Sequence, residues 1–189
     1  METLLSVLIG LGLSAACGFR VFVPLLIASL AARSGHLQIW SGLDWIGSTP
    51  ALIAFAVATG LEIAGYYIPW VDHLLDAIAT PTAVVAGVIL TAGALTQGMD
   101  PFLRWTLALL AGGGTAAVFQ GVTATARGLS TATTGGLGNP VVATIEAGGS
   151  ALLSVVAIVL PVVAVCAIVL LLTYVSRRLL FRRRSTARA

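Results

Sequence analysis

Long apolar stretches separated by short polar or glycine-rich segments dominate the chain. Six such stretches cover residues 4–32, 50–69, 81–97, 102–127, 140–160 and 161–175. At 1.5 Å per residue, helices of the longer stretches would span roughly 30 to 40 Å, which suits a lipid bilayer. Because these stretches are apolar all round, the pattern predicts an all-α fold, a polytopic transmembrane helical bundle, rather than a barrel.

Charged and helix-breaking residues interrupt two of these stretches and predict broken helices. The first stretch contains Arg20 and Pro24, so we expect a break or a kink there. The last two stretches meet at Pro161 without a polar loop, so they form either one kinked helix or a very tight hairpin. Five or six membrane crossings follow.

Three dipeptides resemble helix starts, because each places a capping residue before a proline. They are Thr49-Pro50, Thr80-Pro81 and Asn139-Pro140. The glycine- and threonine-rich segment 128–139 reads as a loop of hydroxyl groups and glycines, which could bind an anion, coordinate a cation through carbonyls, or simply fold back into the bundle.

Weak internal similarity suggests two repeats, residues 4–98 and 102–175. The first contains Ser14-Ala15-Ala16 before Phe19, and the second contains Thr115-Ala116-Ala117 before Phe119. Three helices per repeat would make it an inverted repeat, an arrangement known in transporters. The alternative is that helices rich in glycine and alanine resemble each other by composition. We expect one transmembrane domain, residues 1–176, and a basic cytoplasmic tail, residues 177–189.

Composition excludes a water-soluble globular domain. Of 189 residues, 58% are hydrophobic and 9% are charged, with a mean hydropathy of +1.04. Glu2 stands where a cleaved signal would carry a basic residue, so we take the first stretch as a membrane helix. The chain contains no lysine, which excludes a Walker-type phosphate loop. Cys17 and Cys166 lie inside apolar stretches and suggest neither a disulfide scaffold nor a metal site.

Arginine is concentrated at the C-terminus, where six of the ten arginines follow the last apolar stretch. These six are Arg177, Arg178, Arg182, Arg183, Arg184 and Arg188. Such a cluster favours a cytoplasmic C-terminus and contact with anionic lipids, in the cell inner (plasma) membrane, and needs no nucleic-acid partner.

Polar residues inside apolar stretches are the best functional candidates, because burial in lipid is costly unless they are paired or hydrated. The substrate-binding or pore-lining candidates are Arg20, Glu62, Tyr66, Gln120, Thr134, Asn139 and Glu146. Their depths along the stretches predict that Arg20 lies within about 6 Å of Glu62 or Glu146. A buried structural ion pair is the alternative role for Glu62.

A second group of candidates follows the second apolar stretch. Asp72 and Asp76 share a helix face, and His73 lies between them. Two carboxylates and an imidazole at this spacing could hold a divalent ion or relay protons. The alternative is a solvated face on a helix at the membrane interface. We expect no resident cofactor and assign no catalytic residue.

Several motifs together resemble the bacterial membrane-protein family catalogued as domain of unknown function 4126. They are Gly18-Phe19-Arg20-Val21-Phe22-Val23-Pro24, Leu61-Glu62 with residues 67–72 and Leu75-Asp76, Ala79-Thr80-Pro81 with residues 85–87, and residues 130–135 with Gly138-Asn139-Pro140-Val141-Val142 and Glu146. Tyr66-Tyr67 departs from the family, where Asp-Lys is common, so no charge-based role carries over to them. The resemblance supports the fold and brings no established activity.

Three functions are compatible with these features. Intramembrane charges, broken helices and the repeat favour a transporter or channel for a small solute, ion or lipid headgroup. The first alternative is a membrane-embedded enzyme or lipid-binding protein that uses Glu62 with Asp72 and Asp76. The second is a non-catalytic membrane assembly subunit. At 19.3 kDa the chain has few helices for an internal path, so we expect a homo-oligomer.

Overall fold

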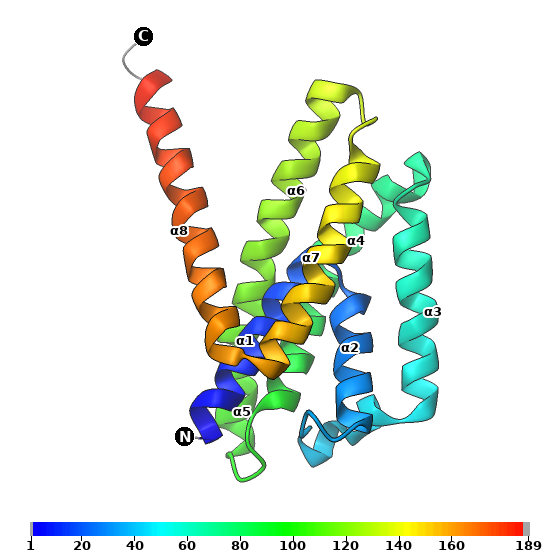
Figure 1. Cartoon of the computed structure of the whole chain (residues 1–189), viewed down its shortest axis with the longest axis vertical. Helices are drawn as coiled ribbons and strands as arrows, with labels where there is room; N and C mark the ends of the chain where they lie inside the picture. The colour runs from blue at the N-terminus through cyan, green and yellow to red at the C-terminus, as the bar shows by residue number, and fades with distance from the viewer. Residues whose placement is uncertain (1, 187–189) are drawn as a thin grey trace.

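The computed structural model describes residues 2–186, apart from the side chains of 69, 70, 72, 73, 76, 175, 176 and 178–186. Over this range the chain is all-helical (Figure 1). The elements are α1 (Glu2–Phe19), α2 (Phe22–Arg33), the 3-10 helix η1 (Ser41–Gly47), α3 (Thr49–Gly65), α4 (Pro69–Ala94), α5 (Pro101–Leu107), the π-helical turn η2 (Ala108–Gly113), α6 (Gly114–Thr134), α7 (Asn139–Val159) and α8 (Pro161–Thr186).

Four helical segments in the described part of the chain are long and apolar enough to cross a membrane. They are Glu2–Phe19, Ala77–Ala94, Pro101–Thr134 and Asn139–Val159. A fifth span arises if η1 and α3, which meet at 60°, act as one bent span. The all-α, multi-pass prediction is therefore confirmed, with four or five candidate spans rather than the expected five or six. The difference arises because α3, from the second apolar stretch, counts as a span only together with η1, and because the apolar part of α8, Pro161–Tyr174, is short.

The chain reverses direction at Arg20, as the sequence predicted a break there. α1 ends at Phe19 and α2 begins at Phe22. Glu2 at the start of α1 and His36 after α2 line the same cavity, so α2 must return toward the end of the bundle where α1 begins. Figure 1 shows this pair, with the N-terminus and the C-terminus at opposite ends of the bundle.

Helix α1 lies at the centre of the bundle, and hydroxyl groups from three other helices bind its carbonyl oxygens. Thr91 of α4 donates to Gly10 at 3.1 Å, Ser150 of α7 donates to Ala16 at 2.9 Å, and Thr123 of α6 donates to Gly18 at 3.2 Å. These carbonyls are accessible because small side chains let the backbones approach closely, as is usual in membrane bundles. The interface of α1 is thus polar as well as tightly packed.

The prolines begin helices at some of the expected positions but not at all of them. Helices begin at Thr49 and Asn139, as predicted. At Pro161 the chain forms the tight hairpin, with α8 running back from the end of α7 (Figure 1). Pro81 does not start a helix; it lies inside α4, which begins at Pro69. A proline removes one backbone hydrogen bond, and tightly packed membrane helices tolerate that loss.

The segment 128–139 is mostly helix rather than loop, which corrects the prediction. Helix α6 continues through Thr134, and only residues 135–138 separate it from α7. Gly135 and Gly136 have φ values of 64° and 92°, a left-handed backbone that favours glycine. Glycine and threonine are therefore accommodated within α6, and the turn needs only its last glycines.

Candidate functional site

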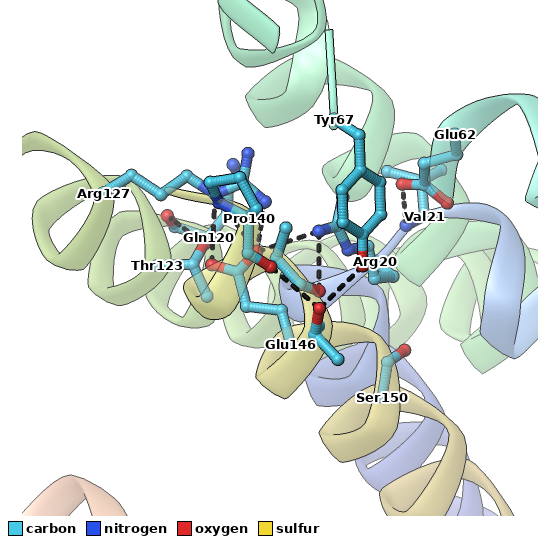
Figure 2. Close-up of polar contacts among 12 residues, drawn as sticks. Arg20, Val21, Glu62, Tyr67, Gln120, Thr123, Arg127, Pro140, Glu146 and Ser150 are labelled. Atoms are coloured by element: carbon cyan, nitrogen blue, oxygen red, sulfur yellow. Dashed lines mark hydrogen bonds and ion pairs between the residues drawn. The ribbon is translucent and has the colours of Figure 1, made fainter. Parts of the chain in front are cut away.

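Four buried side chains from four separate segments meet beside the break between α1 and α2. Arg20 lies in the break, Tyr66 at the end of α3, Arg127 on α6 and Glu146 on α7. Their exposed fractions are 2%, 6%, 6% and 4% in that order. We call these four residues the charged centre; Figure 2 shows the two arginines directed toward Glu146.

Arg20 binds α7 in two ways. Its Nη2 donates to the carbonyl oxygen of Ala143 at 2.9 Å and lies 3.4 Å from Oε2 of Glu146. The predicted pairing of Arg20 with a carboxylate from another helix is therefore confirmed, with Glu146 as the partner. The Nε and Nη1 atoms of Arg20 are buried and have no hydrogen-bond partner among the described residues. A buried unsatisfied donor typically costs about 1–3 kcal/mol.

Arg127 binds the same carboxylate more closely. Its Nε lies 3.1 Å from each oxygen of Glu146, and its Nη2 also donates to Oε2. Such charge-assisted bonds between a guanidinium and a carboxylate are among the strongest side-chain contacts in proteins. One carboxylate thus serves two guanidinium groups, and the charged centre carries a net charge of one positive unit when all three groups are ionised.

Tyr66 lies between the two cations. The guanidinium carbon of Arg20 is 3.7 Å from the ring centroid of Tyr66, and that of Arg127 is 3.8 Å from the same centroid. Two guanidinium groups at these distances would overlap on one face, so they occupy opposite faces of the ring. Cation–π attraction on both faces partly replaces the water that each cation loses.

Glu62 is bound to backbone rather than to solvent. Its Oε1 accepts a hydrogen bond from the amide of Val21 at 2.9 Å, and its Oε2 accepts one from the amide of Phe22 at 3.1 Å. These amides open helix α2, so the carboxylate caps the positive end of that helix from the neighbouring α3. Glu62 therefore holds the break that places Arg20.

The remaining candidates lie in different places. Gln120 is buried on α6, near Thr123 and Arg127 (Figure 2). Thr134 accepts a hydrogen bond from the amide of Gly138 at 2.9 Å, and Asn139 donates to Thr131 at 3.1 Å. These bonds stabilise the turn between α6 and α7, and the turn is separate from the charged centre.

The carboxylate and imidazole candidates of α4 are described only by their backbone. At Asp72, His73 and Asp76 the backbone is helical, within α4, and the side chains lie outside the described residues. The metal or proton site proposed for them stays a prediction. The side chains of the C-terminal arginines from Arg178 onward also lie outside the described residues, so lipid binding by this tail stays a prediction too.

Arg127 stands out in the sequence as a charge inside an apolar stretch but was not chosen as a site candidate, and Arg104 was missed. Arg104 is fully buried and donates to the carbonyl oxygens of Ala92, Leu95 and Thr96 at 2.7, 2.9 and 2.5 Å. It thereby caps the C-terminal end of α4, and its guanidinium carbon lies 4.4 Å from the ring centroid of Trp40. The signal was the one that identified Arg20, a charge inside an apolar stretch.

A cavity of about 480 Å³ lies at the end of the bundle that carries the N-terminus. It is lined by the start of α1, by residues 36–38, and by residues 94–98 after α4. Leu95 and Thr96, which bind Arg104, form part of its wall. The cavity contains polar groups from Glu2, His36 and Gln97, and it does not include any residue of the charged centre.

Comparison with known proteins identifies a family but no activity. The family model described as domain of unknown function (DUF4126) matches residues 7–180, nearly the whole chain. The chain therefore belongs to this family. No curated protein matches the chain. No solved structure matches it either.

Proposed function

We propose that this member of the DUF4126 family is a transporter or channel that passes a small solute, ion or lipid headgroup through the bundle by way of the charged centre. The observation that supports this most is the convergence of Arg20, Arg127 and Glu146, from three segments, beside a broken helix. Ionisable groups and broken helices in the interior of a membrane bundle characterise substrate and ion pathways.

The energetics also favour a functional role over a purely structural one. An arginine at the centre of a membrane helix costs at least ~2.5 kcal/mol on insertion scales, and the charged centre contains two. Replacing a buried ion pair by apolar residues is often neutral or stabilising, so stability alone gives little reason to keep it. In the proposed mechanism the contacts of Glu146 with both arginines close the path, and their rearrangement opens it.

The second candidate function is an assembly subunit without transport. It is supported by the dryness of the charged centre, whose members are all more than nine-tenths buried. Under this alternative, the two arginines and Glu146 serve only to join α1, α6 and α7. An enzyme or a lipid-binding protein would use Glu62 with Asp72 and Asp76, whereas the carboxylate of Glu62 is bound to the amides of Val21 and Phe22.

Measurement of the flux of several small solutes into vesicles distinguishes a transporter from an assembly subunit. Purified protein is reconstituted into liposomes, and stopped-flow light scattering follows their volume after mixing with glycerol, potassium chloride, potassium phosphate or potassium acetate. Transport predicts that at least one solute crosses faster than in protein-free vesicles. Arg20→Gln and Arg127→Gln should abolish that flux, whereas Arg33→Gln, at an exposed arginine that binds Gly47 and Thr49, should retain it.

An assembly subunit gives a different result. It predicts that no solute of the panel crosses faster with protein than without it. Flux that persists unchanged in both the Arg20 and the Arg127 variants would contradict a path through the charged centre.

The orientation and the oligomeric state are further parts of the proposal. We propose the cell inner membrane, a homo-oligomer, and a cytoplasmic C-terminus whose arginines bind anionic lipid, worth about 1 kcal/mol for each arginine near the surface. A reporter fused after Ala189 should be active only in the cytoplasm. For the repeat, α1 and α6 are the helices to compare, and they run in the same direction where they pack, because Ser14 binds Gly112 and Thr123 binds Gly18. Equivalent helices of an inverted repeat would run in opposite directions.

A further inference from the structure

We propose that the charged centre binds a small oxyanion, a carboxylate or a phosphate group, in the place that the carboxylate of Glu146 occupies. This inference rests on the proposed function and names the class of substrate that the path would take. It concerns binding, so it can be tested without any measurement of transport.

The arrangement of charged groups in the centre favours an anion. Arg20 and Arg127 both contact Glu146, and Glu62 is engaged by the amides of Val21 and Phe22. The two guanidinium groups therefore share a single carboxylate. Glu62 adds a negative charge near both arginines, but its oxygens bind the amides of α2, so an anion in the place of Glu146 would meet guanidinium donors and no second carboxylate.

Arg20 also carries donors that the protein leaves unused. Its Nε and Nη1 atoms are buried and have no hydrogen-bond partner among the described residues. Buried donors without partners are uncommon in native proteins and call for an explanation. Each of these atoms shares an edge of the planar guanidinium with Nη2, which already faces Glu146, so an oxyanion in that place would accept from Nη2 together with one of them.

Neighbouring groups fix the orientation of the guanidinium donors of Arg20 and Arg127. Tyr66 stacks against both guanidinium groups, and the carbonyl of Ala143 accepts from Nη2 of Arg20. These contacts fix the planes of both cations before any ligand arrives. A ligand that binds pre-oriented groups loses less affinity to ordering of the site.

The geometry of Glu146 indicates the chemical class of the ligand. This residue already presents two oxygens to Arg127 at 3.1 Å each, which shows that the site accepts an oxyanion of this size. A halide is a single negative atom and cannot form the bidentate pair of hydrogen bonds that two oxygens form with one guanidinium. Glu146 is thus an internal competitor, and removal of its charge should strengthen the binding of an external oxyanion.

The test uses the full chain, purified and placed in lipid nanodiscs. Calorimetry measures the binding of inorganic phosphate and of acetate, against chloride at equal ionic strength. The wild-type chain should bind at least one of the two oxyanions, and Glu146→Gln should bind it at least about tenfold more tightly. Asp100→Asn, the matched loss of a carboxylate at the N-terminal cap of α5, should leave the affinity unchanged. Arg20→Lys, which keeps the charge but removes the fork, should weaken binding.

Thermal unfolding keeps the test decisive if Glu146→Gln is unstable. A ligand that binds the folded state raises its stability, so phosphate or acetate should raise the melting temperature of this variant more than chloride does. The inference is overturned if neither oxyanion binds or stabilises the wild-type chain or Glu146→Gln. It is overturned equally if Asp100→Asn gains as much affinity as Glu146→Gln.

Two sources of oxyanion are separated by a parallel titration with a short-chain phosphatidic acid in micelles. Binding of inorganic phosphate or acetate identifies a free anion, whereas binding of the lipid alone identifies a headgroup. The failure of this inference also differs from that of the proposed function. Oxyanion binding without flux contradicts transport alone, and flux of glycerol or potassium chloride without oxyanion binding contradicts this inference alone.

Discussion

The carboxylate of Glu62 accepts a hydrogen bond from the amide of Val21, 41 residues earlier in the chain, at 2.9 Å. The same carboxylate binds the next amide, that of Phe22. A side chain of α3 thus supplies the cap that α2 cannot obtain from its own sequence, because its N-cap residue, Val21, has no side-chain acceptor. The position of Arg20 depends on this bond between two otherwise separate helices.

We predict that Glu62→Gln destabilises the folded protein by about 2–3 kcal/mol, because two buried bonds to a charged acceptor are lost or weakened. Denaturation in mixed micelles measures the change in the free energy of unfolding. Glu2→Gln, at an exposed carboxylate in the first turn of α1, is the control and should change it by less than about 0.5 kcal/mol. Equal effects of the two substitutions would contradict the capping role.

Tyr66 should stabilise the charged centre through its ring. Tyr66→Leu removes cation–π contacts with both arginines and should cost at least ~2 kcal/mol in the free energy of unfolding. Tyr66→Phe keeps the ring and should cost less than half as much. Tyr67 is the matched control: it is exposed, its hydroxyl lies 2.7 Å from that of Thr144, and Tyr67→Leu should cost less than ~1.5 kcal/mol. If Tyr66→Phe is as harmful as Tyr66→Leu, stacking does not explain the arrangement.

Two glycines should respond oppositely to the same substitution. A Cβ on Gly18 would lie 2.8 Å from the carbonyl oxygen of Ala116 and 2.8 Å from the amide nitrogen of Gln120, whereas one on Gly121 would meet no heavy atom within 4 Å. Gly18→Ala should therefore cost about 1–3 kcal/mol, and Gly121→Ala should be neutral or stabilising by up to ~1 kcal/mol. Melting temperatures in one detergent measure both; a neutral Gly18→Ala would show that α1 and α6 can separate without cost.

Arg104 should be essential for the end of α4. Arg104→Leu leaves the carbonyls of Ala92, Leu95 and Thr96 without this donor, and we expect a loss of about 3 kcal/mol at roughly 1 kcal/mol for each bond. Arg104→Lys should retain part of that stability, because an ammonium can still reach some of these oxygens. The free energy of unfolding measures both changes. A Lys variant no more stable than the Leu variant would show that the fork itself is required.

The sequence identified buried charged residues more readily than it identified the residues from other helices that bind them. Arg20 and Glu146 were identified because each is costly inside an apolar stretch, and they pair. Arg127 was placed at the end of its stretch because Gly128 and the threonines after it resemble a loop. Arg127 is buried because Glu146, 19 residues later, compensates its charge. The hydrophobic pattern along the chain does not show which residues of different helices come into contact.

The misplaced helix start at Pro81 has a related cause. Local rules weigh one lost hydrogen bond against helix formation, whereas Ala79 and Ala83, on either side of this proline, are buried in the bundle. Packing around a proline decides whether a membrane helix continues through it. The helix starts at Thr49 and Asn139 were predicted correctly because the extended residue Ser48 precedes the first and the turn 135–138 precedes the second.

The central position of α1 has a consequence for biosynthesis. This helix is synthesised before the other described helices, yet the hydroxyl groups that bind its carbonyl oxygens belong to Thr91, Thr123 and Ser150. The last of these is synthesised 134 residues after Ala16, its acceptor. The small residues of α1 that pack against α7 are therefore covered only after α4 and α6 have been made. The bundle is thus completed around a helix that precedes all of its partners in the chain.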